Sequence, residues 1–336
     1  MTDVKTRSIV PGDKPRTLSR RTLTAVLGVS AFLRPRLSIA RQASPAWQTG
    51  APLPAPGSEF AAAVMDGVIY VAGGFDVESR LFAFDIAATA WTEGAALPEP
   101  RHHAGLAALD GYVYLAGGHD HESQAVDTAW RYDPVSDSWE DLPSLPQGPR
   151  GALGLAAMDR KVYAVGGSSG DLSGPATADC VCFDSATTAW TELEPMPTAR
   201  EHLTVGAAGG VLVAIGGRNG GDDGDGMGGA TEVFDPVTAS WKAGSPLPVP
   251  RSGMGVASAG ETIIVIGGEG MDGLYADVNR YDPVANVWDA LPSLPGGRHG
   301  AASAFVDETL YAIGGSTLAF TIQSVADVSV LEIDAV

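Results

Sequence analysis

The chain has 336 residues and a formal net charge of −19, with 21 lysines and arginines against 40 acidic residues. The charge is uneven along the chain, because residues 1–41 hold nine cations and two acids, whereas the remainder holds twelve cations and thirty-eight acids. A body this acidic repels nucleic acid and anionic membranes, so we expect neither as a partner.

The amino-terminal segment, residues 1–43, has the pattern of an export signal. Arg20 and Arg21 precede an apolar run over residues 25–33 that is too short to span a bilayer stably, and residues 38–40 offer a small-x-small cleavage site. The segment resembles a twin-arginine signal, and an accidental Arg-Arg pair beside a short apolar run is the alternative. We therefore expect an exported protein, periplasmic or extracellular, with no membrane association once the signal is removed.

A short apolar segment closed by a glycine pair recurs six times along the chain. Apolar runs of this length predict buried β-strands, and the glycine pair indicates a backbone with positive φ or a close approach of two chains. The six copies stand at residues 66–74, 110–118, 159–167, 209–217, 260–268 and 307–315.

Other landmarks keep fixed positions around each copy. A segment of small residues such as residues 60–64 precedes it, which suits a strand near a crowded central axis. In five repeats an aspartate stands six residues before a tryptophan, and this predicts a turn between two further strands. Each unit therefore predicts a four-stranded antiparallel blade. The tryptophans are Trp47, Trp91, Trp139, Trp190, Trp241 and Trp288.

The glycine pair, the aromatic residue before the aspartate, the six-residue gap to tryptophan and the Leu-Pro-x-x-Arg sequence together resemble the kelch repeat, a β-propeller family, over about residues 46–336. The resemblance implies an all-β, six-bladed β-propeller of four-stranded antiparallel blades in residues 44–336. Trp47 heads a fourth strand that lacks its first three, and the last repeat has no tryptophan. We therefore expect the N-terminal strand to complete the last blade and close the ring.

The repeats differ mainly in one connection. From the second glycine to the aspartate the spacing is 11, 15, 17, 18, 14 and 19 residues, whereas the spacing from the arginine position to the first glycine is 16 in every repeat. In an up-and-down meander, this second-to-third loop shares one face with the fourth-to-first connection, and variable loops on a fixed scaffold commonly bind ligands. All six histidines fall in these connections: His102, His103, His119, His121, His202 and His299.

The candidate ligand-binding residues lie in the fourth-to-first connections. One arginine recurs there in every repeat except the first, where Gly57 takes its place, and the residues after it vary. The arginines allow two interpretations, an anion-attracting ring for a carboxylate or acidic sugar, and a structural brace that bonds carbonyls or stacks on tryptophan. The candidates are Arg101, His102, His103, Arg150, Arg200, Glu201, His202, Arg251, Arg298 and His299.

Two segments have residues that bind metals elsewhere. His119 and His121, with His103, could supply metal ligands, and a polar loop is the alternative. Residues 218–226 are rich in glycine and aspartate and could bind Ca²⁺, but they lack the twelfth-position glutamate of an EF-hand loop, and a solvated loop is the alternative. We expect no metal and no cofactor.

The fold expectation leaves three functions open. The first is a binding or interaction module that captures a glycan or a protein with this face, in an oligomeric state left open. The second follows from the resemblance to bacterial exported six-bladed kelch proteins, which include sialic acid mutarotases. It is a mutarotase or epimerase of an acidic sugar with Glu201 and His202 as acid/base pair. The third is a galactose-oxidase-like copper enzyme, which is disfavoured because Cys180 and Cys182 lead into a third strand, where we interpret them as packing thiols rather than a redox or metal pair.

Overall fold

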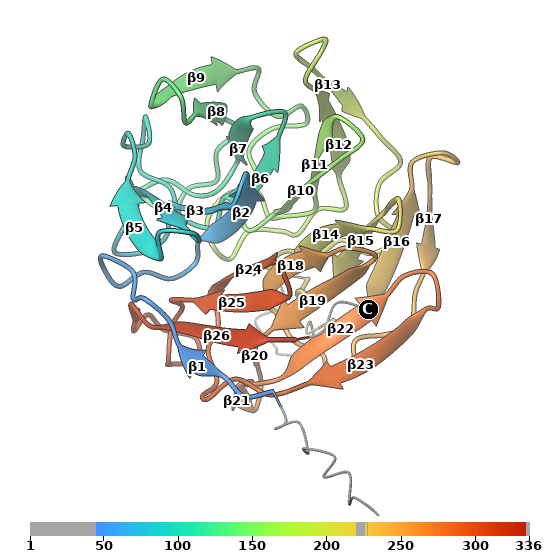
Figure 1. Ribbon diagram of the computed structural model, residues 1–336. Coiled ribbons are helices and arrows are strands. Elements are labelled where there is room, and N and C mark those ends of the chain that lie inside the picture. Colours follow the sequence, from blue (N-terminus) through green and yellow to red (C-terminus); the bar gives the residue numbers. More distant parts are fainter. Residues whose placement is uncertain (1–44, 220–225, 227, 334–336) are drawn as a thin grey trace, which may run out of the picture. The chain divides into compact units, whose positions relative to one another are not determined.

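The computed structural model describes residues 45–219, 226 and 228–333, and these residues form six four-stranded antiparallel sheets set around a common axis (Figure 1). This confirms the expected all-β, six-bladed propeller. The part of the chain so described contains no helix, and therefore no helix able to cross a bilayer. The predicted export signal in residues 1–43 lies outside the described residues.

Each blade runs outward from the axis through four strands. Blade 1 has β2 (Ala61–Met65), β3 (Val68–Ala72), β4 (Leu81–Asp85) and β5 (Ala90–Glu93). Blade 2 has β6 (Gly105–Leu109), β7 (Tyr112–Ala116), β8 (Ala129–Asp133) and β9 (Ser138–Leu142). Blade 3 has β10 (Gly154–Met158), β11 (Lys161–Val165), β12 (Cys180–Asp184) and β13 (Ala189–Glu192). Blade 4 has β14 (Thr204–Ala208), β15 (Val211–Ile215), β16 (Thr231–Asp235) and β17 (Ser240–Ala243). Blade 5 has β18 (Gly255–Ala259), β19 (Thr262–Ile266), β22 (Val278–Asp282) and β23 (Val287–Leu291).

Blade 6 joins the two ends of the described chain. Its strands β24 (Ala302–Val306), β25 (Thr309–Ile313) and β26 (Val328–Glu332) come from the end of the sequence, and its outermost strand is β1 (Gln48–Thr49). Gln48 pairs with Val330 and Thr49 with Ser329. Trp47 stands directly before this strand, so the predicted closure of the ring is confirmed.

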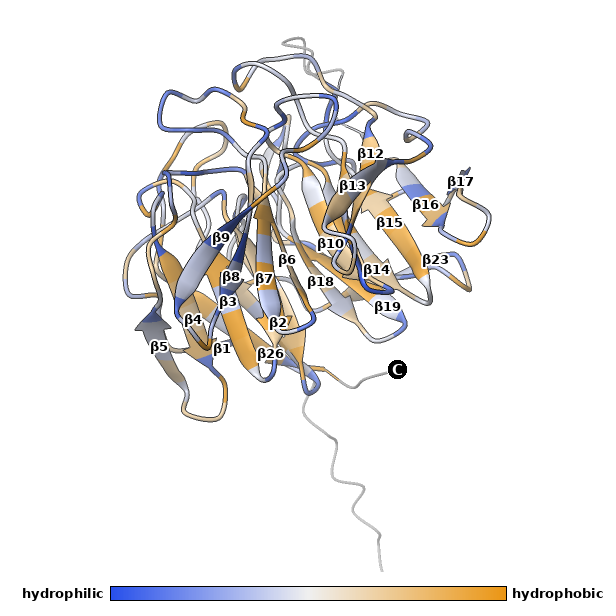
Figure 2. Cartoon of the chain, turned by 90° about the horizontal axis from the view of Figure 1, so that it is seen from above, coloured by the Kyte–Doolittle hydropathy of each residue, from blue (hydrophilic) through white to orange (hydrophobic). Residues whose placement is uncertain are grey.

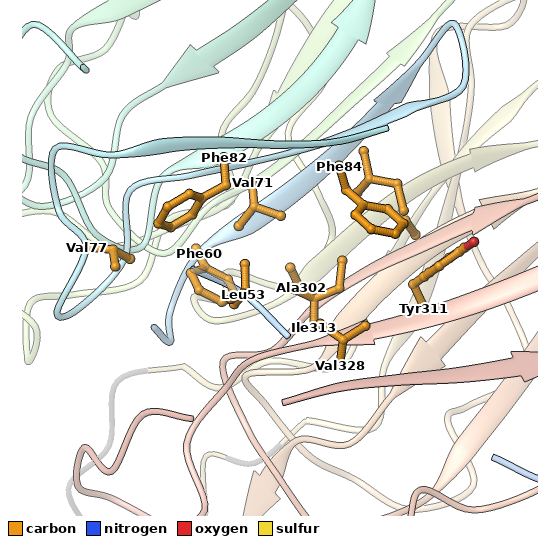
Figure 3. Packing of buried hydrophobic residues seen from close by; sticks show 12 residues of the cluster. Leu53, Phe60, Val71, Val77, Phe82, Phe84, Ala302, Tyr311, Ile313 and Val328 are labelled. Atoms are coloured by element: carbon orange, nitrogen blue, oxygen red, sulfur yellow. The ribbon is translucent and has the colours of Figure 1, made fainter. Parts of the chain in front are cut away.

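The apolar core is divided into six clusters, and each lies between two neighbouring blades. Figure 3 shows the cluster between blades 1 and 6, where Phe82 and Val71 face Ile313 and Val328. Strands buried on both faces in this way have near-continuous apolar sequences, which is why the segments before the glycine pairs carry so little polarity. No blade has a core of its own, so the blades stabilise one another.

The tryptophans bond neighbouring blades together. In all six blades the indole Nε1–H donates to a backbone carbonyl oxygen of the preceding blade, at 2.7–3.0 Å. Trp47 of blade 6 makes this bond to Pro292 of blade 5, so the series is complete around the ring. The constant spacing of tryptophan in the sequence therefore reflects a repeated interblade contact.

The glycine pair bonds the next blade at its arginine position. The N–H of the second glycine donates to the carbonyl oxygen of that residue at 2.8–3.0 Å in every blade, with Gly57 in the slot for the last pair. A Cβ on the first glycine, Gly216 for example, would lie within 2.7 Å of the same oxygen, and its φ is +59°. Both the close approach and the left-handed backbone therefore require glycine at this position.

Candidate functional site

The longer connections gather on one side of the blades and the short turns on the other, as Figure 2 shows. We call the side with the second-to-third and fourth-to-first connections the loop face. Blade 5 adds a small hairpin there, formed by β20 (Glu269–Gly270) and β21 (Gly273–Leu274).

Six residues form a closed ring of backbone hydrogen bonds around the axis at this face. In each blade the residue two positions after the arginine slot donates its N–H to the carbonyl oxygen of the equivalent residue in the preceding blade, at 2.8–3.0 Å. All six have φ between 49° and 61°, a region that glycine adopts freely and other residues adopt with strain. The members of this axial ring are Glu59, His103, Ala152, His202, Gly253 and Gly300.

A second set of residues surrounds the axial ring. In every blade the residue directly after the arginine slot forms an antiparallel bridge with the residue that follows the glycine pair. The bridged pairs are Ser58 with Phe75, His102 with His119, Gly151 with Ser168, Glu201 with Arg218, Ser252 with Glu269, and His299 with Ser316. The scaffold thus presents three side-chain positions per blade to the axis, and these are the positions at which the blades differ.

Nine polar side chains from these positions meet at the axis and form what we call the axial cluster. All are buried except that of Arg218, which is 25% exposed. Apart from Glu232 and the five repeated arginines, the cluster holds every fully buried carboxylate, histidine and cationic side chain within the described residues. Its members are Glu59, His102, His103, His119, Glu201, His202, Arg218, Glu269 and His299.

Four histidines of the axial cluster are neutral. The Nδ1 atoms of His102 and His103 are 2.6 Å apart, and the ring of His102 stacks between Phe75 and His119, at centroid distances of 4.2 and 5.5 Å. Burial, and then the charge of His119, lowers the pKa of His102 to about 4, and burial also lowers the pKa of His119 to about 4. Burial first, and then the adjacent imidazoles and Arg218, which disfavour a further positive charge, hold the pKa values of His103 and His202 well below the usual range.

His299, unlike these four histidines, is protonated at neutral pH. Its Nδ1 lies 2.8 Å from Oε1 of Glu59 and 3.8 Å from Oε2 of Glu269. Burial alone would lower the pKa of His299, but the hydrogen bond to Glu59 and the charges of Glu59 and Glu269 outweigh it and raise that pKa to about 9. The axial cluster therefore holds a protonated imidazole close to neutral ones at neutral pH.

Glu201 connects blade 4 to the rest of the axial cluster. Its carboxylate accepts a bond from the Nε of Arg218 at 2.6 Å and contacts Nδ1 of His202 through its other oxygen. Arg218 also reaches Glu269 of blade 5 at 3.4 Å, so one guanidinium bridges two carboxylates. The Glu201 and His202 pair named from the sequence is thus in direct contact.

The repeated arginines have the contacts of a brace. Arg101, Arg150, Arg200, Arg251 and Arg298 are only 0–7% exposed. In the last four, the guanidinium donates to the carbonyl oxygen of the first glycine of its own blade. Arg101 instead bonds the carbonyl of Pro100 and lies 4.6 Å above the ring of Trp130. Of the two interpretations of these arginines, this geometry supports bracing, because the charged groups are used by the scaffold rather than presented to a ligand.

A cavity of about 370 Å³ runs along the axis. The first strands of all six blades line it with small residues, as expected for strands at a crowded axis. Glu59, His103 and His202 of the axial ring belong to the same lining. The part of the cavity wall at the axial ring therefore carries a carboxylate and two imidazoles, whereas the strands contribute mostly small apolar side chains and backbone.

Other residues named from the sequence lie apart from the axial cluster or outside the described residues. The His121 side chain is 66% exposed, with Glu122 at 3.8 Å, whereas His119 is fully buried beside His102. Most of the glycine- and aspartate-rich segment lies outside the described residues. Cys180 and Cys182 are free and buried in β12, as expected of packing thiols.

Three members of the axial cluster were not among the candidates from the sequence. Glu59 occupies an axial-ring position, and Arg218 and Glu269 directly follow glycine pairs. Each bridged pair is separated by 17 residues, as in Glu201 and Arg218, so this constant spacing is a signal that would have found Arg218 and Glu269. Glu59 stands two positions after the arginine slot, as His103 and His202 do.

These features define a class of protein, a closed six-bladed propeller with a polar site on its axis. A model for the KLHDC2/KLHL20/DRC7 Kelch-repeats domain matches residues 37–217, and the Kelch motif matches residues 250–295. The chain therefore belongs to the kelch-repeat β-propeller family. Propellers of this kind are protein-interaction or binding modules.

The individual proteins that resemble this chain have low sequence identity to it. Alpha-scruin and beta-scruin of Limulus polyphemus are 28% and 27% identical over 144 and 148 residues, which is 42% of this chain and 15% of the length of each scruin. A solved structure titled "Structure of YjhT" covers 83% of this chain and 95% of its own, with a TM-score of 0.72 and 20% identity. At that identity the likeness shows the fold alone.

Proposed function

We propose that the chain is an exported binding module that captures a sugar-sized carbohydrate at the axial cluster. The observation that carries this proposal is that Glu59, His103 and His202 line one part of a cavity of about 370 Å³, with the other six polar side chains of the axial cluster packed around them. That volume lies within the range of small-molecule sites, which run from roughly 300 to 1,000 Å³.

The chemistry of the axial cluster suits a polyhydroxylated ligand. The carboxylates of Glu59, Glu201 and Glu269 accept hydrogen bonds from hydroxyl groups, and Arg218 donates them. The ring of Phe75 stacks on His102 and meets His103 at right angles, which adds apolar surface beside the polar groups. His102, His103, His202 and His299 take the ligand-binding role expected of them from the sequence.

A thermal-unfolding screen of the full chain against sialic acid, uronic acids and neutral sugars tests this proposal. Binding to the folded state raises the melting temperature, and the stabilisation grows with the logarithm of the ratio of ligand concentration to dissociation constant. Stabilisation by acidic sugars should depend on Arg218, because it is the partly exposed cation of the axial cluster. The same shift in Arg218→Gln as in the parent protein would contradict this assignment.

A protein ligand is the second class that the kelch fold supports, and exposed apolar side chains on the loop face favour it. Met271, Leu318, Phe320 and Ile322 are 40–64% exposed in the loops of blades 5 and 6. The backbone N–H of Phe320 donates to Glu269 at 2.9 Å, which holds these loops together. A protein partner predicts loss of binding in Met271→Ser with Leu318→Ser, whereas carbohydrate binding at the axis should survive that double substitution.

An acidic-sugar mutarotase is a further candidate, favoured by the contact between Glu201 and His202. Ring opening at an anomeric carbon moves a proton from the anomeric hydroxyl to the ring oxygen. Neutral His202 can take that proton, the carboxylate of Glu201 then stabilises the imidazolium formed, and this imidazolium delivers the proton to the ring oxygen, with Arg218 nearby for the carboxylate of the sugar. Polarimetry or NMR of anomer exchange tests it. An unchanged exchange rate with every acidic sugar that binds would exclude this activity.

Export is proposed from the sequence of residues 19–40 alone. Replacing Arg20 and Arg21 with lysines should leave the full-length protein in the cytoplasm, because the twin-arginine route requires the pair. Cell fractionation of a bacterial host with that export route measures the result. Equal amounts of the parent protein and of the variant in the periplasm would contradict the proposal.

A further inference from the structure

Three side chains of the axial ring bring potential ligand atoms together. Glu59, His103 and His202 each offer one such atom, and these atoms all lie within 4.8 Å of one another. Nε2 of His103 and Oε2 of Glu59 are 3.3 Å apart. Two atoms bound to a tetrahedral zinc ion at ~2.0–2.1 Å lie about 3.4 Å from each other, so this pair already has the spacing of a metal site.

The other ring nitrogen of each histidine is held by a neighbour. Nδ1 of His103 lies 2.6 Å from Nδ1 of His102, and Nδ1 of His202 contacts the carboxylate of Glu201. Metal-binding histidines commonly donate their second N–H to a partner of this kind, which fixes the tautomer and the ring orientation. The arrangement leaves Nε2 of both rings as the metal-facing nitrogen.

The carboxylate of Glu59 is oriented in the same way. Its Oε1 is 2.8 Å from Nδ1 of His299, whereas Oε2 is the oxygen near His103. All three side chains therefore have one polar atom fixed by a neighbour and one available.

The backbone beneath the three side chains is fixed as well. Each belongs to the axial ring, and their φ values are 54°, 55° and 49°. Gly253 and Gly300 show that glycine fits this position, but blades 1, 2 and 4 place a carboxylate and two imidazoles there, and Ala152 has the same left-handed φ. Retained strain of this kind is typical of functional sites.

The local charge also favours a cation. Glu59, Glu201 and Glu269 face the axis, and Arg218 and His299 only partly balance them. The positive charge of Arg218 opposes the binding of a cation, since its Nη2 lies 3.4 Å from both ring nitrogens of His202. Its guanidinium is bound by two carboxylates, however, and its side chain is partly exposed.

We propose that Glu59, His103 and His202 form a binding site for a divalent transition-metal ion, zinc above all, and leave a fourth coordination position open. Two imidazole nitrogens and one carboxylate oxygen are a donor set of zinc sites that keep a position for water or substrate. This inference does not rest on the carbohydrate proposal.

A neighbouring trio is the competing site. His102, His103 and His119 also bring their ligand atoms within 4.8 Å of one another. Neither ring nitrogen of His119 has a hydrogen-bond partner among the residues that the structure describes. That trio has no carboxylate to balance the charge of a divalent ion, so we favour the trio with Glu59. A His119 variant separates the two sites.

Calorimetric titration of zinc chloride into the metal-free full-length protein tests the inference. The parent protein should bind one equivalent. Glu59→Gln and His202→Ala should weaken binding by more than the ~10–100-fold loss that removal of an outer partner causes, and Glu201→Gln should show that smaller loss. His119→Ala should bind as the parent does, and His121→Ala is the matched control for loss of an exposed histidine.

Two results would overturn the inference. One is the absence of a stoichiometric zinc site in the parent protein. The other is loss of zinc binding in His119→Ala together with unchanged binding in His202→Ala. Because a variant could fail to fold, melting temperatures are measured with and without zinc. Zinc should raise the melting temperature of the parent protein and of His119→Ala, but not that of Glu59→Gln.

Discussion

Within each repeat, the scaffold residues are constant from blade to blade, whereas the residues at the positions of the axial cluster differ. In the scaffold, every blade makes the same interblade bonds from tryptophan and from the glycine pair. At the axis, the same three backbone positions carry glutamate, histidine, arginine, serine, alanine, phenylalanine or glycine in different blades. Repetition therefore marks what holds the propeller together, and departure from repetition marks the site for which we propose ligand binding.

Removal of a scaffold arginine should have the largest effect on stability. Arg200→Met leaves the carboxylate of Glu232, buried and 2.7 Å from the guanidinium, without its partner. We expect the free energy of unfolding to fall by roughly 3–5 kcal/mol, measured by urea denaturation. Arg160→Met, which removes an exposed arginine, is the control. A loss below about 1 kcal/mol would mean that the arginine is not a brace.

Glycine substitutions compare the two regions directly. Gly216→Ala in the scaffold would place a Cβ 2.6 Å from the carbonyl oxygen of Arg251 at a φ of +59°, and we expect a loss of about 3 kcal/mol from strain and overlap. Gly253→Ala in the axial ring has a similar φ, but its nearest neighbour is 3.6 Å away, so the loss should be only about 1 kcal/mol. Equal losses in thermal or urea unfolding would show that the axial ring is as intolerant as the scaffold.

Loss of one tryptophan bond should have a smaller effect. Trp190→Phe removes the 2.7 Å hydrogen bond from the indole to Pro143 of the preceding blade and keeps an aromatic ring beside Phe183. We expect a loss of roughly 1 kcal/mol, the usual net value of such a bond. Trp190→Leu, which also removes the ring contact, should cost more, and the reverse order in urea denaturation would contradict this account.

The buried thiols should show no reaction in the folded protein. Burial raises the pKa of Cys180 to about 12 and also raises that of Cys182. Since only the thiolate reacts, a disulfide reagent at pH 8 should modify neither thiol until the protein is unfolded in urea, where both should react. Rapid modification under native conditions would place these thiols in an accessible or reactive environment.

The fold was predictable because it depends on features that recur at fixed spacing. Trp47, standing apart from the other repeats, was enough to predict that the N-terminal strand closes blade 6. The arginines were named for the same reason, and their regularity left binding and bracing as alternatives. Their carbonyl and carboxylate partners become apparent only when the second and third strands of one blade lie side by side.

The axial cluster was only partly predictable. The histidines pointed to the correct face, since their positions in connections follow from strand topology. Glu59 was not among the candidates, because its partner His299 is more than two hundred residues away in sequence and adjacent only in a closed ring. Arg218 and Glu269 lie after the glycine pairs of neighbouring blades 4 and 5 and meet only when these blades pack together.

The most direct test of the central claim replaces six of the nine residues of the axial cluster with residues that other blades carry at the same positions. The substitutions are Glu59→Gly, His103→Ala, Glu201→Ser, His202→Gly, Arg218→Ser and Glu269→Ser. Because each replacement already fits the scaffold elsewhere, the variant should fold with a similar melting temperature. It should lose the stabilisation that acidic sugars and zinc give the parent protein, whereas a variant that folds and keeps both shifts would contradict the account.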